Sequence, residues 1–395
     1  MTSSTFCPLP FSHLNIKHEG KVSACWRYPD ELGNYTSSTL EEIWNNKNIK
    51  QLRKSLLNSE KPAGCKSCWD LEASNSKSTR LQQMEERFSD ITEEKVRSII
   101  NEDFSYPKDQ LTQIEVRFDN TCNLMCRMCN ADYSSQWERA VKRDDDLLAG
   151  VLKYSSNRKF DYHIKLTDDV IDQIKKLSNN LTEILIAGGE PIYHEKHYSF
   201  LESLQDNAKN IILSYNSNLN SLTFKGKSIV DLWKNFKKII LRVSIDGDPS
   251  CYEYVRVNGN LNKVEQNLSF LKTNLTNADI SATNTVSLFN ITHFVDIIKY
   301  FRQLDVQFHS SLVQYPRPLN IKLLPIHIKE HITNEFNYWI LDNPNKRTEK
   351  YSRNIINYMN SEDWHSEWQT FIDYANILDN FHNTKLLDVY PEYNF

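Results

Sequence analysis

The 395-residue chain has little glycine, no long apolar run and no block of basic residues. A membrane-spanning helix needs about 18 or more continuous apolar residues, so we expect none here. The first residues lack the basic and apolar segments of a signal peptide, and the net charge of −4 does not suggest a nucleic-acid binder. We therefore expect a globular protein of the cytoplasm, where thiols stay reduced, with no nucleic acid or membrane as a partner.

Cysteine is the residue type whose distribution is most informative. Seven of the eight cysteines fall into two groups, and only Cys251 stands alone. The groups are Cys7, Cys25, Cys65 and Cys68, and then Cys122, Cys126 and Cys129. In a reducing compartment, clustered cysteines are better explained as metal ligands than as disulfides. The sequence therefore predicts two metal centres.

From about residue 111 onward, short β-rich runs alternate with stretches whose apolar residues recur every three or four positions. The expected strands are Ile114–Phe118, Glu183–Ala187, Asn210–Ser214, Ile239–Ile245 and Ile280–Ser287. The expected helices are Val170–Leu177, Tyr198–Leu204, Ile229–Phe236, Val264–Leu271 and Phe294–Phe301. Repeated strand–helix units imply parallel strands with right-handed crossovers. They predict an α/β fold with a partial, open TIM-like β/α barrel, in which the loops after the strands carry the chemistry.

The rest of the chain lacks this alternation. The first 85 residues hold four cysteines, two short β-like runs and a helix that begins at Thr39 with a capping box and runs towards Leu56. The end of the chain is aromatic-rich and has a helical pattern. We therefore predict a small cysteine-rich domain at 1–85, a linker at 86–110, the partial barrel at 111–312 and a mainly helical region at 313–395.

Cys122, Cys126 and Cys129 lie in one loop directly after the first predicted barrel strand. Three thiolates separated by three and then two residues can converge on one compact metal site. A structural zinc ion takes four ligands, and an ordinary ferredoxin-type cluster takes four cysteines. Three cysteines would therefore leave one iron of a four-iron cluster open to an outside molecule.

This CxxxCxxC loop resembles the signature of the radical S-adenosylmethionine (SAM) superfamily. The resemblance implies a 4Fe–4S cluster whose open iron binds the amino and carboxylate groups of SAM. Reductive cleavage of SAM then gives methionine and a 5′-deoxyadenosyl radical, with a reductant such as flavodoxin or ferredoxin as a partner. The family usually has an aromatic residue before the third cysteine, and here Met128 stands in that position to contact the adenine.

Another motif of the same family follows the second predicted strand. Gly188, Gly189, Glu190 and Pro191 match the GGEP segment that holds the methionyl amino group. Paired glycines let the backbone approach a ligand closely, and a carboxylate suits an ammonium group. After the third strand, Asn216 matches one residue of a Thr-Asn-Gly segment that lies near the adenosyl group.

The fourth predicted strand ends in Ser244-Ile245-Asp246-Gly247, which resembles the family's S-x-D-G edge. The resemblance implies that Ser244 contacts the ribose or the carboxylate of SAM and that Arg256 pairs with the methionyl carboxylate. Asp246 is either a turn residue or a substrate contact. Cys251 is either an ordinary, partly buried cysteine or a member of a radical relay. Asp246 and Cys251 are thus the candidate catalytic residues.

The segment His194-Glu195-Lys196-His197 is close to the H-E-x-x-H motif of zinc proteases. Its histidines are three residues apart, however, whereas that motif needs four. We interpret the segment as the start of the helix that follows GGEP.

The four cysteines near the beginning of the chain could complete a site by themselves, and their spacing alone does not separate zinc from iron–sulfur. The surrounding sequence resembles the SPASM/twitch module. The matching segments are Cys-Pro, Gly-Lys-Val-Ser-Ala-Cys, Leu-Glu-Glu-Ile-Trp and Cys-Lys-Ser-Cys. The resemblance implies an auxiliary 4Fe–4S cluster held by Cys7, Cys25, Cys65 and Cys68. That module usually follows the barrel, whereas here it precedes it.

Together these resemblances imply a two-cluster radical SAM oxidoreductase that removes a hydrogen atom from its substrate. The auxiliary cluster would accept an electron or position the substrate. Substrates in this family group are often peptides or proteins modified after translation, and the alternative is a dehydrogenase or epimerase of a small molecule. A non-catalytic iron–sulfur or zinc protein is a remote alternative, because an electron carrier needs no open three-cysteine site.

Overall fold

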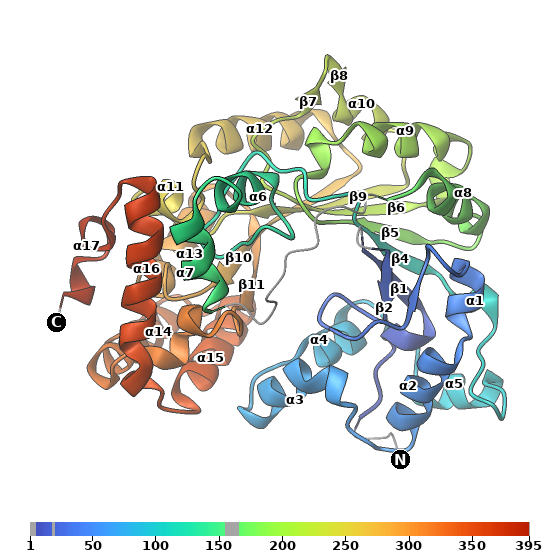
Figure 1. The fold of residues 1–395 in the computed structure, drawn as a ribbon, viewed down its shortest axis with the longest axis horizontal. Coiled ribbons are helices and arrows are strands. Elements are labelled where there is room, and N and C mark those ends of the chain that lie inside the picture. Colours follow the sequence, from blue (N-terminus) through green and yellow to red (C-terminus); the bar gives the residue numbers. More distant parts are fainter. Residues whose placement is uncertain (1–4, 18–19, 155–165, 395) are drawn as a thin grey trace. The chain divides into compact units, whose positions relative to one another are not determined.

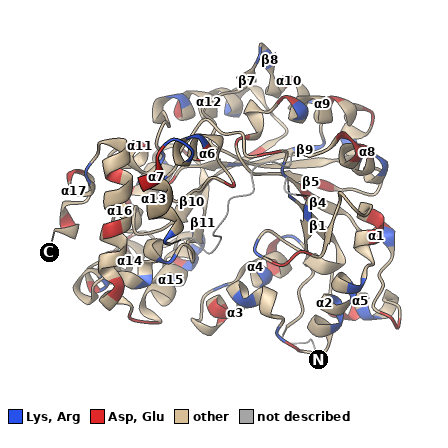
Figure 2. Cartoon of the chain, in the orientation of Figure 1, with Lys and Arg blue, Asp and Glu red and all other residues tan. Residues whose placement is uncertain are grey.

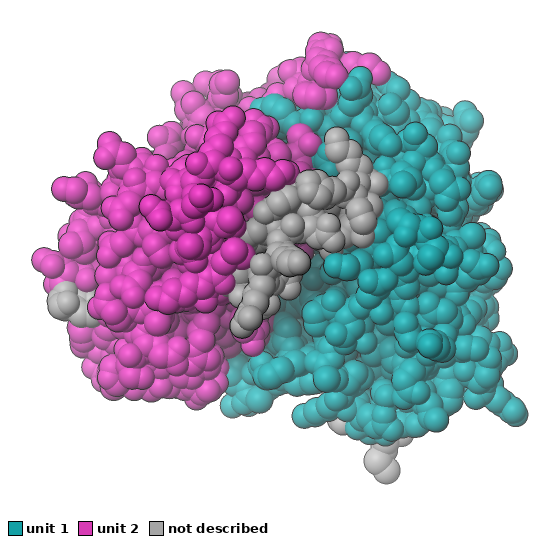
Figure 3. Space-filling model, in the orientation of Figure 1, with its two compact units in different colours: residues 1–119, 163–215, 228–240 teal, residues 120–162, 216–227, 241–395 magenta. Residues whose placement is uncertain are grey.

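The computed structural model describes residues 5–17, 20–154 and 166–394 (Figure 1). The chain forms two compact units, which Figure 3 colours separately. Unit 1 comprises Met1–Asp119, His163–Tyr215 and Ser228–Ile240, and unit 2 comprises Asn120–Tyr162, Asn216–Lys227 and Leu241–Phe395. The predicted barrel segment 111–312 contributes to both units. The predicted boundaries at residues 85, 110 and 312 stay predictions.

Unit 1 is built on a sheet whose strands hydrogen-bond in the order β9-β6-β5-β4-β1-β2-β3. The pairs β1–β4, β4–β5 and β5–β6 are parallel, whereas β1–β2 and β2–β3 are antiparallel. The ends of β6 and β9 pass into unit 2. The strands are β1 (His13–Ile16), β2 (Lys21–Ser23), β3 (Gly33–Asn34), β4 (Gln113–Val116), β5 (Glu183–Ile186), β6 (Ile212–Ser217) and β9 (Lys238–Ser244).

Strand β1 joins the cysteine-rich segment to the first barrel strand. It pairs in parallel with β4, with His13 opposite Gln113 and Ile16 opposite Val116. Both Ile16 and Val116 are fully buried, so the two segments share one hydrophobic core. The sequence did not predict this pairing, because nothing local to either strand identifies its partner.

The prediction of a single helix from Thr39 towards Leu56 is wrong in one respect, because the structure has two helices there. Thr39 caps α1 (Leu40–Trp44) with the predicted capping box, and the helix then ends. Asn46 starts α2 (Lys47–Leu57) by accepting two backbone hydrogen bonds from its first turn. Asparagine competes with the helical backbone in a helix interior and is favoured at an N-cap, which explains the break.

The other helices of unit 1 pack around this sheet (Figure 1). They are α3 (Lys66–Ala73), α4 (Thr79–Glu86), α5 (Glu93–Ile99), α8 (Asp168–Leu177), α9 (Glu195–Ser203) and α10 (Ile229–Trp233). The segment 86–110 contains α5 and is therefore partly helical.

Unit 2 contains the end of β9 and the strands that follow it in the order β11-β10-β9. Strands β10 (Ala278–Val286) and β11 (Gln307–Leu312) pair in parallel. A small pair, β7 (Thr223–Phe224) and β8 (Lys227–Ser228), stands apart from this sheet. The helices are α6 (Ser135–Val141), α7 (Asp145–Leu152), α11 (Tyr252–Val255), α12 (Leu261–Asn274), α13 (Phe294–Gln303), α14 (Ile326–Asp342), α15 (Lys346–Asn360), α16 (Trp368–His382) and α17 (Leu386–Val389).

The predicted strands and helices of the barrel are all present, and their ends agree within three residues. Strand β11 was missed, because its sequence Gln-Phe-His-Ser-Ser-Leu buries only Phe308 and Leu312. The mixed α/β fold with a parallel sheet and a helical C-terminal region is confirmed.

Charged residues of both signs are interspersed along the helices of both units (Figure 2). This mixture agrees with the small net charge of −4. Within the part of the chain that the structure describes, no helix combines the length and the apolar character needed to cross a membrane.

Candidate functional site

The three-cysteine loop lies in unit 2, just before α6. Cys126 is buried, whereas Cys122 and Cys129 are half-buried. The first turn of α6 holds the loop, because the Cys122 amide donates to the Ser135 hydroxyl (3.1 Å) and the Trp137 indole donates to the Cys126 carbonyl (2.9 Å). The Cys129 amide also donates to the Cys126 carbonyl at 2.9 Å, which closes a tight turn. Contacts within the protein therefore determine the shape of the loop.

The thiols of this loop lie in an environment that opposes free thiolates. Burial raises the pKa of the Cys129 thiol to about 12, and the nearby Cys126 raises it further. Two thiolates this close need a cation to compensate their charge. Met128 lies half-buried in the turn between them. The donor set and its surroundings thus fit a metal cluster.

Arg127 follows Cys126 and is fully buried. Its guanidinium forms an ion pair with Asp379 of α16 (2.9 Å) and donates to the Thr384 hydroxyl (2.6 Å). The same group lies 3.7 Å from the centroid of the Tyr254 ring, and its Nε donates to the Tyr254 carbonyl at 2.7 Å. The C-terminal region therefore holds the cluster loop in place, a role that the sequence did not predict.

Arg256, predicted to contact SAM, lies close to the cluster loop. Its guanidinium forms a buried ion pair with Asp246. Burial alone would lower the pKa of Arg256, but the Cys126 thiolate and the Asp246 carboxylate together raise it well above its ordinary value. The second carboxylate oxygen of Asp246 accepts from the Thr285 amide at 2.6 Å. The structure therefore brings Asp246 and Arg256 together beside Cys126.

The two other predicted SAM contacts of unit 2 lie at the ends of strands. Asn216 is exposed near the end of β6, and Ser244 is the half-buried last residue of β9. Asn218, two residues after Asn216, is buried and donates to the Asn123 side chain of the cluster loop at 2.7 Å. Sequence reasoning missed Asn218, although a polar residue just after a barrel strand was an available signal. The roles of Asn216 and Ser244 stay predictions.

In unit 1 the GGEP segment follows β5. Gly188 and Gly189 have φ values of +80° and +55°, a region that other residues rarely adopt. A Cβ atom on Gly188 would lie 2.9 Å from the Arg117 side chain. Glu190 is buried, and its carboxylate caps the short helix that begins at Pro191. The backbone path therefore favours glycine at both positions, most strongly at Gly188.

His197 fastens the GGEP segment to the sheet. As predicted, it lies in the helix after GGEP, α9. Its Nδ1 lies 2.9 Å from the Pro191 carbonyl oxygen and its Nε2 lies 2.8 Å from the Tyr215 hydroxyl. A carbonyl only accepts, so Nδ1 carries the proton and the neutral Nε2 accepts from Tyr215. Burial lowers the pKa of His197 to about 3, so the ring stays neutral.

Replacing His197 with glutamine is expected to make the free energy of unfolding less sensitive to acid, so that it falls less as the pH decreases. The unfolded chain binds a proton at His197 below pH 6.5, whereas the folded chain does so only below about pH 3. The wild-type free energy of unfolding should therefore fall, as pH decreases through this window, by about 1.4 kcal/mol per unit from this residue. Urea unfolding at pH 7 and pH 5 measures this slope. An unchanged slope in His197→Gln, or an equal change in the exposed control His365→Gln, would contradict the assignment.

The four N-terminal cysteines gather in unit 1. Burial raises the pKa of Cys7 well above its ordinary value, and the neighbouring Cys25 raises it further. Burial also raises the pKa of Cys25 and of Cys65 to about 12, and Cys68 adds to both shifts. Thiols that act on one another in this way lie close together in a poorly hydrated place. The fold therefore assembles the predicted four-ligand set.

The spacing of these sulfurs bears on the choice between zinc and iron–sulfur. One zinc ion lies about 2.3 Å from each of its sulfurs, which brings them to about 3.8 Å of one another. Among the described residues, one group of three or more possible metal ligands has its atoms within 4.8 Å, and it contains none of these cysteines. A four-iron cluster is larger than a single ion and holds its sulfurs farther apart. Among the described residues, the four sulfurs are therefore not gathered at the spacing of a single zinc ion.

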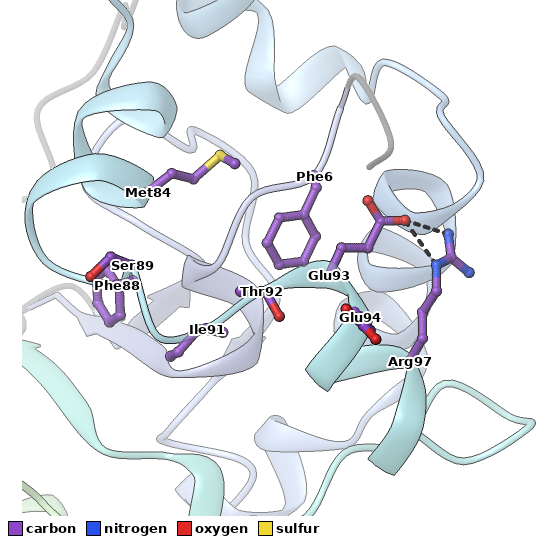
Figure 4. Close-up of a pocket in the computed structure, with 9 residues that line it drawn as sticks. All are labelled: Phe6, Met84, Phe88, Ser89, Ile91, Thr92, Glu93, Glu94 and Arg97. Atoms are coloured by element: carbon purple, nitrogen blue, oxygen red, sulfur yellow. Dashed lines mark hydrogen bonds and ion pairs between the residues drawn. The ribbon is translucent and has the colours of Figure 1, made fainter. Parts of the chain in front are cut away.

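A pocket of about 640 Å³ lies in unit 1 (Figure 4). Phe6, which precedes Cys7, forms part of its wall, together with Met84. A charged edge is formed by Glu93 and Arg97, whose carboxylate and guanidinium lie 2.6 Å apart. Sequence reasoning missed this pocket, because its lining comes from segments that are distant along the chain.

Glu115 is a second feature that sequence reasoning missed. It lies in β4, is fully buried, and accepts from Arg117 through Oε1 at 2.7 Å. Its Oε2 has no hydrogen-bond partner among the described residues. A buried carboxylate oxygen without a partner costs stability, so the position is not explained by packing alone. The charged residues that alternate along this apolar strand were the available signal.

Two family models match the chain. The iron–sulfur cluster-binding domain named SPASM matches residues 7–69, and the radical SAM superfamily matches residues 116–301. The comparison with curated proteins returned no match.

Several solved structures are similar to this chain at low identity. They include anSMEcpe with bound AdoMet (19% identity, 58% of this chain and 59% of that chain, TM-score 0.41). SuiB from Streptococcus suis bound to the precursor peptide SuiA is 11% identical over 75% of this chain and 52% of that chain, with a TM-score of 0.39. The methyltransferase TsrM from Kitasatospora setae is 12% identical over 51% and 35%, with a TM-score of 0.32. The chain thus spans less than two thirds of the length of each of these proteins.

The two domain matches together take in more than half of the chain. They coincide with the two sets of cysteines, Cys7 to Cys68 in the first and Cys122 to Cys129 in the second. The cofactors implied are a SAM-binding 4Fe–4S cluster, an auxiliary cluster and SAM itself. The chain therefore has a radical SAM domain over residues 116–301, and an iron–sulfur cluster-binding SPASM domain precedes it at residues 7–69.

Proposed function

We propose that this radical SAM enzyme is an oxidoreductase that removes a hydrogen atom from a peptide or protein and so modifies it after translation. The observation that supports this best is the three-cysteine loop, which offers one ligand too few and has Arg256 beside Cys126. When bound, the cluster of this loop supplies the electron that cleaves SAM into methionine and a 5′-deoxyadenosyl radical. A reductant such as flavodoxin or ferredoxin replaces that electron.

The residues of this chain bind and orient SAM in our proposal. Arg256 has a buried Nε without a hydrogen-bond partner among the described residues, and this guanidinium suits the methionyl carboxylate. Asp246 holds that guanidinium in position, since its own two oxygens are occupied by Arg256 and the Thr285 amide. Ser244 would contact the ribose or the carboxylate.

The remaining contacts come from three segments. Glu190 presents a buried carboxylate for the methionyl ammonium, on a loop that Gly188 and Gly189 allow to turn. Met128 would lie against the adenine, where its polarisable sulfur makes favourable contact with a ring. Asn216 would lie near the adenosyl group.

The auxiliary domain favours a peptide over a small molecule as the substrate. Enzymes that this domain combination resembles often modify peptides or proteins. The auxiliary cluster, fully ligated by Cys7, Cys25, Cys65 and Cys68, would take the electron that remains on the substrate after hydrogen removal, or would position the substrate. A dehydrogenase or epimerase of a small molecule is the second candidate.

Anaerobic reconstitution tests the proposal. The protein should bind about eight irons per chain, four for each cluster. With dithionite it should convert SAM to 5′-deoxyadenosine, and peptides encoded beside its gene should raise the yield and change in mass. Stimulation by a small alcohol and by no peptide would favour the second candidate. Bound zinc without any nucleoside product would exclude both, since neither can proceed without cleavage of SAM.

A further inference from the structure

Asp248, Cys251 and His293 form a cluster of possible metal ligands in unit 2. One ligand atom from each of the three residues lies within 4.8 Å of the other two. Asp248 and Cys251 are buried, and His293 is half-buried. Asp248 and Cys251 come from the loop after β9, whereas His293 directly precedes α13. None of them belongs to the two sets of cysteines already described.

The local backbone brings these side chains together. A Cβ atom on Gly247 would lie 2.7 Å from the Tyr252 amide nitrogen and 2.8 Å from the Cys251 sulfur, so only glycine leaves room for the sulfur here. The Cys251 amide donates to the Asp248 carbonyl at 3.2 Å, which folds the loop back on itself. This turn carries the carboxylate and the thiol to the same side.

A second connection brings His293 to that loop. The Asn290 side chain donates to the Asp246 carbonyl at 3.0 Å, and the His293 amide donates to the Asn290 carbonyl at 3.2 Å. The His293 Nδ1 then lies 3.0 Å from the Asp248 carboxylate and 3.2 Å from the Ser250 hydroxyl. These backbone and Asn290 contacts therefore place the His293 imidazole against the loop that carries Asp248 and Cys251.

The donor set matches a zinc ion in chemistry and in size. Zinc binds sulfur at about 2.3 Å and nitrogen or oxygen at about 2.0–2.2 Å, which puts the N and O ligands of one tetrahedron about 3.3 Å apart. The observed 3.0 Å between Asp248 and His293 needs little change to reach that spacing. One thiolate and one carboxylate also balance the two positive charges of zinc, so the ion could be buried without net charge.

The C-terminal segment encloses this place. The Tyr390 ring lies edge-on to the His293 ring, with centroids 5.2 Å apart, and its hydroxyl interacts with Cys251. Tyr390 also donates to the Phe289 carbonyl, which anchors it. Tyr393 lies near Cys251 as well. Aromatic walls exclude water, which strengthens the attraction between a cation and its anionic ligands.

We propose that Asp248, Cys251 and His293 bind one zinc ion, with water in the fourth position. The ion would tie the loop after the catalytic strand β9 to the start of α13. This gives Cys251 the role of a ligand, an alternative to the radical relay considered from the sequence. The ion is separate from both iron–sulfur clusters, so the assignment does not depend on the proposed reaction.

Metal analysis of the reconstituted holoenzyme tests this site. We expect about one zinc per chain besides the iron, and an X-ray absorption spectrum at the zinc edge with one sulfur at about 2.3 Å and the other ligands nitrogen or oxygen at about 2.0–2.2 Å. Cys251→Ser and His293→Gln should each lower the bound zinc at least about tenfold while the iron content is unchanged. The spectrum of the wild type requires no variant to fold.

His365→Gln is the matched control for these variants. His365 also pairs with an aspartate, Asp363, at 2.8 Å, but it is exposed and belongs to no group of three ligands among the described residues. This variant should keep the full zinc content. A wild-type protein without zinc, or zinc that persists in Cys251→Ser, would overturn the proposal. So would a spectrum with four sulfurs, which would mean that zinc had entered the four-cysteine set.

Discussion

Replacing Cys126 with alanine is expected to abolish formation of 5′-deoxyadenosine from SAM. The loop then offers two thiolates, which are too few to retain a four-iron cluster that has three cysteine ligands. Cys126 is also the buried cysteine of the loop and lies next to Arg256, so its loss removes the charge that faces that guanidinium. Iron should fall from about eight to about four per chain. Iron analysis and chromatography of the nucleoside product measure both effects.

The double variant Cys65→Ala and Cys68→Ala is the matched comparison. It should also lose about half of the iron, but from the other cluster, because it removes two of the four auxiliary ligands. It should nevertheless keep some cleavage of SAM, since the three-cysteine loop is intact. Equal and complete loss of cleavage in both variants would contradict the separate roles of the two sites. Retained cleavage in Cys126→Ala would contradict the assignment of the SAM-binding cluster.

Replacing Asp379 with alanine is expected to destabilise the protein by about 3–5 kcal/mol. The substitution leaves the Arg127 guanidinium buried without its counter-charge, and an unpaired buried charge is far more costly than a lost surface contact. It also removes the acceptor of the Tyr254 hydroxyl (3.0 Å) and of the Leu386 amide (2.6 Å). Denaturant unfolding of the wild type and the variant measures the difference.

An exposed ion pair provides the control for Asp379. Glu349 lies 2.8 Å from Arg353 on the surface of α15, with both side chains roughly half exposed. Because solvent screens such a pair, Glu349→Ala should change the free energy of unfolding by no more than about 1 kcal/mol. If Asp379→Ala costs no more than this control, Arg127 does not depend on the C-terminal region. Iron content provides a second readout, since Asp379→Ala should also weaken retention of the SAM-binding cluster.

The contacts of Arg127 indicate what the region after the barrel strands contributes to the structure. A side chain in the middle of the cluster loop is held by α16 and by Thr384, which lies 257 positions further along the sequence. Tyr374 of α16 also lies close enough to Cys129 for that thiolate to raise its pKa, although burial is the larger cause. The C-terminal helices therefore form part of the environment of the cluster, and they do not act as a separate appendage.

The sequence by itself determined most elements of the barrel and the grouping of seven cysteines into two sets. Five barrel strands and five barrel helices were predicted with ends within three residues, because hydrophobic periodicity is a local property of each segment. The loop of Cys122, Cys126 and Cys129 was equally easy to recognise, because its cysteines are separated by only two or three residues. The break between α1 and α2 was also local, but the competing N-cap at Asn46 was overlooked.

Only the tertiary structure decided which distant segments meet. The pairing of β1 with β4, the ion pair of Arg127 with Asp379, and the approach of His293 to Cys251 join residues that have no local relation. Such contacts depend on how the whole chain packs. A buried charge or thiol can interact only with groups that the fold places next to it, and these groups can be distant in sequence. The sequence thus revealed that this chain binds clusters and SAM, and the fold revealed what holds the cluster loop and where a further metal can bind.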